Sequence, residues 1–392
     1  MTIQKAPAIG AAESMTPAGM AAPGALLAVI HELGPRFAAA AAANDESDAF
    51  VAENIAALKA AGLAAAAVPA ELGGGGASHA ELCAALRALA GYCASTALAF
   101  SMHSHQVALA AWRWRHQKPA PIEALLKRVA AENILLLTSG GSDWLPSSGT
   151  AERVEGGFRV SARKVFASGA PAANLYSTSA VYDDPEAGPT VLHFSLPIPT
   201  EGLKILPTWR SLGMRATASH DMLMKDVFVA DAAVSLRRPR DKWHPILHLI
   251  SMIALPAVYS VYLGLAEAAR DLTLRQVARR GSDPRLISLA GELETELAAA
   301  RLAVEDMIAT AATSEPGVAT TNRIMIGRNL AARAVLKTVD IALDAAGGAG
   351  FSRSFGLERL FRDAQAARYH PMPDSVQRDF TGRVALGLSV DG

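Results

Sequence analysis

The chain has 392 residues, of which 51% are hydrophobic and 19% are charged. This composition excludes an intrinsically disordered protein, and the length allows two or three domains whose core needs no disulfide or metal. The 37 basic residues equal the 37 acidic residues, which argues against nucleic acid or an acidic membrane surface as a partner. Cys83 and Cys93 lack metal-ligand spacing, so we expect buried thiols, no metal site and a cytoplasmic protein.

The first 132 residues contain two kinds of segment. Residues 1–23 carry prolines and scattered glycines without a continuous apolar core, which predicts a disordered tail. Residues 24–132 repeat apolar side chains at helical spacing, as in "DAFVAENIAALKAAGL", and this predicts an N-terminal helical domain. Within it, the glycine run of "VPAELGGGGASHAEL" predicts a turn, after which Ser78 can cap the next helix.

The pattern changes twice more along the chain. Residues 133–236 contain short alternating runs such as "GFRVSARKVFAS", which predict a compact antiparallel β barrel or sandwich. Residues 237–392 return to amphipathic spacing and predict four or five long helices. Residues 246–266 are apolar enough for a membrane span, but His248 and Pro256 interrupt them and the helical pattern continues beyond. We therefore expect a buried bundle helix and no membrane segment.

Three motifs in this order resemble the acyl-CoA dehydrogenase superfamily of flavoproteins. They are "GLAAAAVPAELGGGGASHAEL", "TSGGSDWLPSSGTAERVEGGFRVSARKVFASGA" and "GGAGFSRSFGLERLFRDAQAARYH". The resemblance implies an N-terminal helical domain, a small middle β domain and a C-terminal four-helix bundle, with a flavin between the bundle and the β domain at a dimer interface. It also implies a homotetramer built as a dimer of dimers.

The resemblance places the flavin ring beside the middle domain. Phe166 would cover the ring, and the hydroxyl of Ser168 would hydrogen-bond to flavin N5, the atom through which hydride or protons pass. Thr138 and Ser142 match the turn that lines the flavin pyrimidine. The Glu-Pro pair usual in that turn is absent from "TSGGSD".

The phosphate end of the flavin is expected at the other end of the bundle. Arg280 matches a pyrophosphate ligand, and Gly347 with Gly348 would allow close approach of the backbone. The phenylalanine that supports adenine in the family is missing, and Asp344 replaces a usual glutamine. We expect FAD, with FMN or reduced flavin from a reductase as the alternative.

The catalytic base departs from the family pattern. The resemblance implies a Glu in one of two places, and these positions hold Pro371 and Ala254. Neither side chain can accept a proton. Candidate replacements are His370 and Asp374, which flank two prolines in "YHPMPD", and His103 in "FSMHSHQ".

Three functions remain open at this stage. The resemblance implies oxidation of an acyl-CoA by hydride transfer to the flavin, with an electron-transfer flavoprotein as acceptor. The missing Glu favours a monooxygenase that takes reduced flavin from a reductase and acts on an aromatic or sulfur compound, with a neutral His370 moving a proton near pH 7. The third is a catalytically inactive flavin-binding or scaffold homologue. Asp374 has an equal structural interpretation, as a helix N-cap in a capping box with Gln377.

Overall fold

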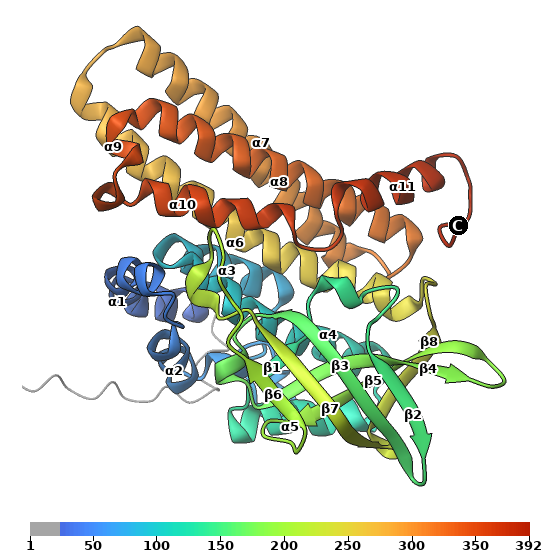
Figure 1. Ribbon diagram of the computed structural model, residues 1–392. Helices are drawn as coiled ribbons and strands as arrows, with labels where there is room; N and C mark the ends of the chain where they lie inside the picture. Colours follow the sequence, from blue (N-terminus) through green and yellow to red (C-terminus); the bar gives the residue numbers. More distant parts are fainter. Residues whose placement is uncertain (1–23) are drawn as a thin grey trace, which may run out of the picture.

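The computed structural model describes residues 24–392, so the predicted tail lies outside the described residues. Helices at both ends of the chain pack around a middle β-sheet (Figure 1). This order confirms the predicted fold class, which is mainly helical with a β domain in the middle.

The elements have the following bounds. The N-terminal helices are α1 (Ala25–Ser47), α2 (Ala52–Ala60), α3 (His79–Tyr92), α4 (Ala94–Gln117) and α5 (Ala120–Glu132). The strands are β1 (Leu136–Thr138), β2 (Thr150–Val154), β3 (Gly157–Ala167), β4 (Leu175–Asp184), β5 (Gly188–Pro197), β6 (Leu203–Leu206), β7 (His220–Ala230) and β8 (Val234–Pro239). The C-terminal helices are α6 (Pro245–Val277), α7 (Pro284–Thr313), α8 (Val318–Ala346), α9 (Gly348–Phe351), α10 (Leu357–Ala364) and α11 (Asp374–Ala385).

The sheet is mixed rather than purely antiparallel. Its strand order is β6-β7-β3-β2-β4-β5-β8, with β1 paired to β4. Most neighbours are antiparallel, but β4 runs parallel to both β1 and β2. The predicted all-antiparallel arrangement is therefore wrong in this detail. Strands β1, β2 and β4 run in one direction. Strand β3, which lies between β2 and β4 in the sequence, runs in the opposite direction.

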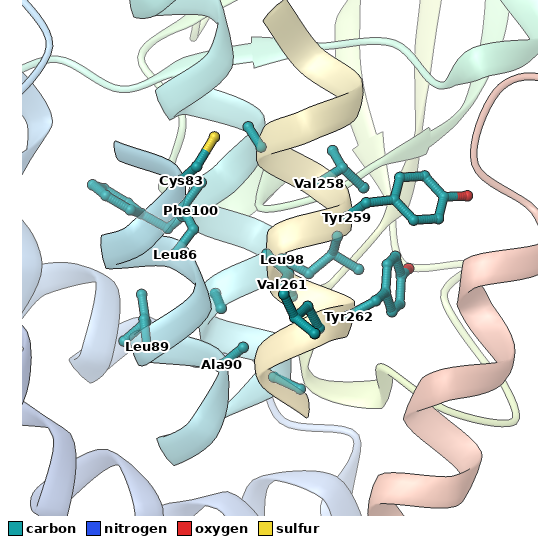
Figure 2. Packing of buried hydrophobic residues seen from close by; sticks show 14 of the residues in the cluster. Cys83, Leu86, Leu89, Ala90, Leu98, Phe100, Val258, Tyr259, Val261 and Tyr262 are labelled. Atoms are coloured by element: carbon teal, nitrogen blue, oxygen red, sulfur yellow. The ribbon is translucent and has the colours of Figure 1, made fainter. Parts of the chain in front are cut away.

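Helix α6 contains the stretch whose composition also fits a membrane span. Its most apolar window is 94% buried inside the protein, where α6 packs against α3, α4, α7 and α8. This burial confirms the predicted core helix. Helix α1 has the length and composition of a span as well, with 33% of its window buried. Figure 2 shows α3 residues such as Leu86 and Leu89 packed on one side of α6, while Tyr259 and Tyr262 point away toward the C-terminal segment.

Helix α10 joins three parts of the chain. Its Arg362 side chain donates to Asp45 at the end of α1, at 2.6 Å. Its Asp363 carboxylate accepts from the backbone N–H of Met214, in the loop before β7. Gly213 lies so close to α10 that an added Cβ would overlap the carbonyl of Arg362. These contacts place the end of α10 beside both the N-terminal helices and the β domain.

We predict that Gly264→Ala destabilises the protein at the α3–α6 contact. An added Cβ there would overlap the carbonyl oxygen of Arg87, and overpacking of a close helix contact costs about 1–3 kcal/mol. Urea unfolding should show a lower midpoint. The matched control is Gly291→Ala in α7, where an added Cβ meets nothing within 4 Å. That change should stabilise by up to about 1 kcal/mol through helix propensity, and equal destabilisation by both would contradict the prediction.

Candidate active site

The loop between α10 and α11 is shaped by two prolines. Pro371 and Pro373 have no N–H, so they cannot donate to the carbonyls three and four residues earlier that a continuing helix would pair with them. The carbonyl of Ala367 instead accepts from the hydroxyl of Tyr259 on α6, at 2.8 Å. The helical pattern therefore breaks where the sequence predicts a break, and side chains from the bundle supply the missing donors.

Arg328 on α8 supplies most of these donors. Its side chain is fully buried, and it donates to the carbonyls of Ala367 at 3.3 Å, Arg368 at 3.2 Å and His370 at 2.6 Å. It also donates to Asp374 at 3.2 Å. The sequence reasoning missed this residue. The sequence does carry a signal for it: in "IMIGRNLAARAV" this arginine lies on the core-facing side of the helix, four residues after the buried Ile324.

His370 lies between the bundle and the N-terminal domain. Its ring centroid is 5.4 Å from that of Tyr262, whose buried hydroxyl has no hydrogen-bond partner among residues 24–392. Burial lowers the pKa of His370 to about 3, with smaller contributions from the charges of Arg328 and His105. The imidazole is therefore neutral near pH 7, so one ring nitrogen can accept a hydrogen bond.

Asp374 is engaged by two arginines. Its carboxylate lies 3.2 Å from Arg328 and 3.5 Å from Arg333. It is the first residue of α11 rather than the N-cap, a position that Pro373 occupies without a side-chain capping bond. The capping-box interpretation is therefore wrong, and the side chain of Gln377 instead bonds Asn329 and Thr381.

His103 is a buried connection between elements. Its Nδ1 accepts from the N–H of Leu136 at 3.0 Å, and its Nε2 donates to the carbonyl of Ala64 at 2.8 Å. Both ring nitrogens are thus occupied, and burial lowers its pKa to about 4. Its neighbour His105 bonds the Ser101 carbonyl through Nδ1 at 2.8 Å. Of the two, His105 is the one that contributes to the lowered pKa of His370.

Phe166 lies near the end of strand β3, and Ser168 directly follows the strand, beside an irregularity in the sheet. The β3–β7 register shifts between Lys164 and Ala167, and Phe166 has a φ of 61°, a conformation that costs energy for an aromatic residue. The ring is turned outward with 56% of its surface exposed, and it meets Trp209 edge-on at 6.1 Å. Backbone strain of this kind is often found at functional sites.

A row of hydrogen-bonded hydroxyls begins at Ser168, two residues after Phe166. The buried Ser168 Oγ lies 2.7 Å from Ser219 Oγ, which lies 2.7 Å from Thr217 Oγ1. Each hydroxyl can donate or accept, because its hydrogen rotates. The Ser168 oxygen can therefore adjust to either protonation state of a bound group.

The turn after β1 brings the β domain against the loop between α10 and α11, which we call the proline loop. Thr138 ends β1, and Ser142 lies in a short 3₁₀ turn, Gly141–Asp143. Asp143 pairs with the buried Lys164 at 3.0 Å, which anchors the turn to β3. Gly141 lies so close to Pro371 that an added Cβ would overlap the proline ring. The proline loop and the turn after β1 therefore meet directly.

The remaining residues predicted to bind the flavin lie in another part of the structure. Arg280 ends the 3₁₀ turn Ala278–Arg280, and its guanidinium would lie 3.8 Å from a Cβ placed on Gly347. Gly347 has a φ of 62°, a conformation that favours glycine, and Gly348 begins α9. Figure 1 shows α9 at the opposite end of the bundle from α11. Within one copy of the chain, the residues predicted to bind the flavin therefore form two separate groups, one near the proline loop and one at α9.

Comparison with known proteins places the chain among relatives. Residues 29–129 match the N-terminal domain and residues 257–374 the C-terminal domain of acyl-CoA dehydrogenases. The chain is 30% identical to the amino sugar nitrososynthase DnmZ of Streptomyces peucetius over 96% of both chains. The chain belongs to the acyl-CoA dehydrogenase family. Within this family it is also 28% identical to a putative acyl-CoA dehydrogenase of Bacillus subtilis, covering 88% of this chain and 93% of that one.

A solved structure of the family gives the same fold. KijD3, crystallised with FMN and a dTDP-linked amino keto sugar, superposes with a TM-score of 0.85 at 27% identity. The match covers 97% of this chain and 98% of that one. The predicted family and fold are therefore confirmed.

We predict that His103 makes stability depend on pH. Because its pKa is about 4 in the folded protein and near 6.5 in an unfolded chain, the unfolded state binds the proton more readily. The stability linked to His103 is therefore complete above about pH 6.5 and decreases as the pH falls, by up to about 1.4 kcal/mol per pH unit. His103→Gln should lower stability at neutral pH but flatten this decrease.

Urea unfolding at several pH values between about 5.5 and 7.5 checks this, in a range above most carboxyl titrations. Five other buried or largely buried histidines with lowered pKa values should keep their share of the slope, namely His79, His105, His193, His248 and His370. The control is His116→Gln at the exposed end of α4, which should leave the slope unchanged. An unchanged slope in His103→Gln would contradict the prediction.

Proposed function

We propose that this chain is a flavin-dependent monooxygenase that uses reduced flavin and molecular oxygen to oxygenate a nitrogen-bearing small molecule. The observation that carries the proposal is the proline loop, where Pro371 stands at the position of the family's catalytic Glu beside the neutral His370. Similarity to an amino sugar nitrososynthase along the whole chain supports this reaction class, because converting an amine to a nitroso group requires oxygen transfer to nitrogen.

Dehydrogenation of an acyl-CoA has weaker support. Removing a proton next to a thioester needs a base held against the substrate carbon. Pro371 and Ala254 occupy the two family positions for that base and cannot accept a proton. The nearby carboxylate of Asp374 already binds two arginines.

The flavin ring fits beside the end of β3. The exposed ring of Phe166 can shield it from water, and Ser168 can hydrogen-bond to it through an adjustable line of hydroxyls. The turn that contains Ser142 lies next to the proline loop through the Gly141–Pro371 contact, and Thr138 precedes this turn at the end of β1. The bound flavin would supply two electrons and activate oxygen.

The histidines provide the proton chemistry of the proposal. In the overall reaction, reduced flavin gives two electrons and two protons, one oxygen atom enters the substrate, and the other leaves as water. We assign His370 to relay the proton that the substrate loses to the oxygen atom that leaves as water. Its imidazole is neutral at working pH and, with a pKa of about 3, passes the proton on rather than retaining it. His105 has its Nδ1 hydrogen on Ser101, which leaves Nε2 as a second acceptor.

We predict that the purified protein, supplied with a flavin reductase, NADH and oxygen, oxygenates a nucleotide-linked amino sugar. Mass spectrometry with isotopically labelled oxygen should find the label in the product. His370→Ala should reduce the turnover rate by about 10²–10⁴-fold, the usual contribution of a general base, while flavin binding is retained.

The alternatives give different results. Bleaching of bound flavin by an acyl-CoA without oxygen, surviving in His370→Ala and Asp374→Asn, would overturn the monooxygenase proposal in favour of dehydrogenation. A protein that gains no thermal stability from FAD, FMN or their reduced forms would be the inactive homologue. His116→Ala is the control for a histidine outside the proposed site.

We predict that Arg280→Met separates FAD from FMN binding. We propose that Arg280 and Gly347 of one copy bind the second phosphate of a flavin whose ring lies in another copy, since one chain separates the two groups. Loss of one phosphate contact should weaken FAD binding by about 10- to 150-fold, since a hydrogen bond to a charged group contributes about 1.5–3 kcal/mol. FMN affinity, measured by fluorescence quenching, should not change. Equal weakening of both flavins would contradict the assignment.

A further inference from the structure

Arg328 is a buried cation with an unusual set of partners. It has no exposed side-chain surface, and three of its acceptors are consecutive or nearly consecutive backbone carbonyls of the proline loop. Its guanidinium also lies 5.4 Å from the ring of Tyr259. Its one carboxylate partner within hydrogen-bond reach in the described chain, Asp374, is 44% exposed.

The carbonyls that Arg328 holds are those that the prolines leave without donors. In an α-helix the carbonyl of Ala367 would pair with residue 371, and in a 3₁₀ turn those of Arg368 and His370 would pair with residues 371 and 373. Both positions are proline and have no N–H. The guanidinium replaces these missing donors and fixes a stretch that helical bonds cannot hold.

Stability alone gives a poor account of this arrangement. Burying a guanidinium costs several kcal/mol of solvation, and apolar replacements of buried ionic groups are often neutral or stabilising. The Nε of Arg328 has no acceptor within residues 24–392, so part of this cost is uncompensated. A side chain with five donors in a fixed fork is suited instead to setting the geometry of several acceptors at once.

We propose that Arg328 is the positioning residue of the active site, whose guanidinium fixes the carbonyls of residues 367–370 and thereby sets where the His370 imidazole lies. This inference rests on the proposed function, because it takes His370 as the group that moves the substrate proton. Arg328 itself acts through the loop and does not contact the substrate.

The surroundings of His370 agree with this role. The polar or charged groups that act on it or contact it are Arg328 from α8, Tyr262 from α6 and His105 from α4. The acidic group that follows it in the chain, Asp374, is paired to Arg328 and Arg333. Arg328 is thus the charge next to the loop that favours a neutral imidazole, in addition to holding its backbone.

The test compares Arg328→Lys and Arg328→Met with the intact full-length protein. Lysine keeps the charge but loses the fork, whereas methionine loses both. We expect turnover to fall about tenfold in the lysine variant and about 10²-fold in the methionine variant, the size expected from a small displacement of a catalytic group. The KM and the affinity for reduced flavin should change by less than about threefold. In the methionine variant, the His370 pKa measured by NMR titration should rise.

Hydrogen exchange of the amides in residues 367–376 gives a readout that does not depend on activity. These amides should exchange faster in both variants and at the wild-type rate in Arg333→Met, which removes the exposed arginine that shares Asp374. Tyr259→Phe removes the other donor to Ala367 and should give a smaller loss of turnover than Arg328→Met.

The outcomes separate the two proposals. Wild-type turnover, His370 titration and exchange in a folded Arg328→Lys or Arg328→Met would overturn the positioning role. If Arg328→Met does not fold, wild-type values in Arg328→Lys alone would overturn it. If wild-type protein makes no oxygenated product while exchange and His370 titration respond to Arg328, the positioning role stands and the proposed function fails.

Discussion

Two prolines and one buried guanidinium set the geometry on which the candidate site depends. Pro371 and Pro373 remove the N–H groups with which α10 would have continued into α11. Carbonyls left unpaired in a protein interior cost free energy, so the loop must find other donors. Arg328 and Tyr259 provide them from α8 and α6. The loop is therefore held by the bundle rather than by its own helical bonds.

Helix α10 connects this end of the bundle to the N-terminal helices and to the β domain. Arg362 binds Asp45 of α1, and Asp363 accepts from Met214 in the β domain. Because these contacts join three parts of the chain, the proline loop lies directly against Gly141 in the turn after β1. The exposed Phe166 ring and the Ser168 hydroxyl belong to this β-domain edge. Packing between domains thus brings together the groups that our proposal assigns to flavin, oxygen and proton chemistry.

Electrostatics distinguish this site from one that dehydrogenates a thioester. The residues that could replace a catalytic carboxylate are histidines made neutral by burial, and the nearby acid is committed to arginines. Neutral imidazoles can accept a hydrogen bond from a substrate N–H or O–H and pass its proton on near pH 7. They are poorly matched to a site that relies on a fixed negative charge. In our proposal, this combination lets the chain keep the family fold while carrying out a different reaction.

The sequence by itself determined the order of domains, the family, the break after α10 and the loss of the usual Glu, because these follow from local periodicity, proline and residue identity. Only the tertiary structure decided what the polar residues do. His103 connects Leu136 of β1 to Ala64, which lies 39 residues before His103 in the chain. Asp374 is paired with Arg328, which lies 46 residues before it. The burial of Arg328 and the parallel β2–β4 contact were decided in the same way. Such roles depend on contacts between residues far apart in the chain, which periodicity and spacing do not encode.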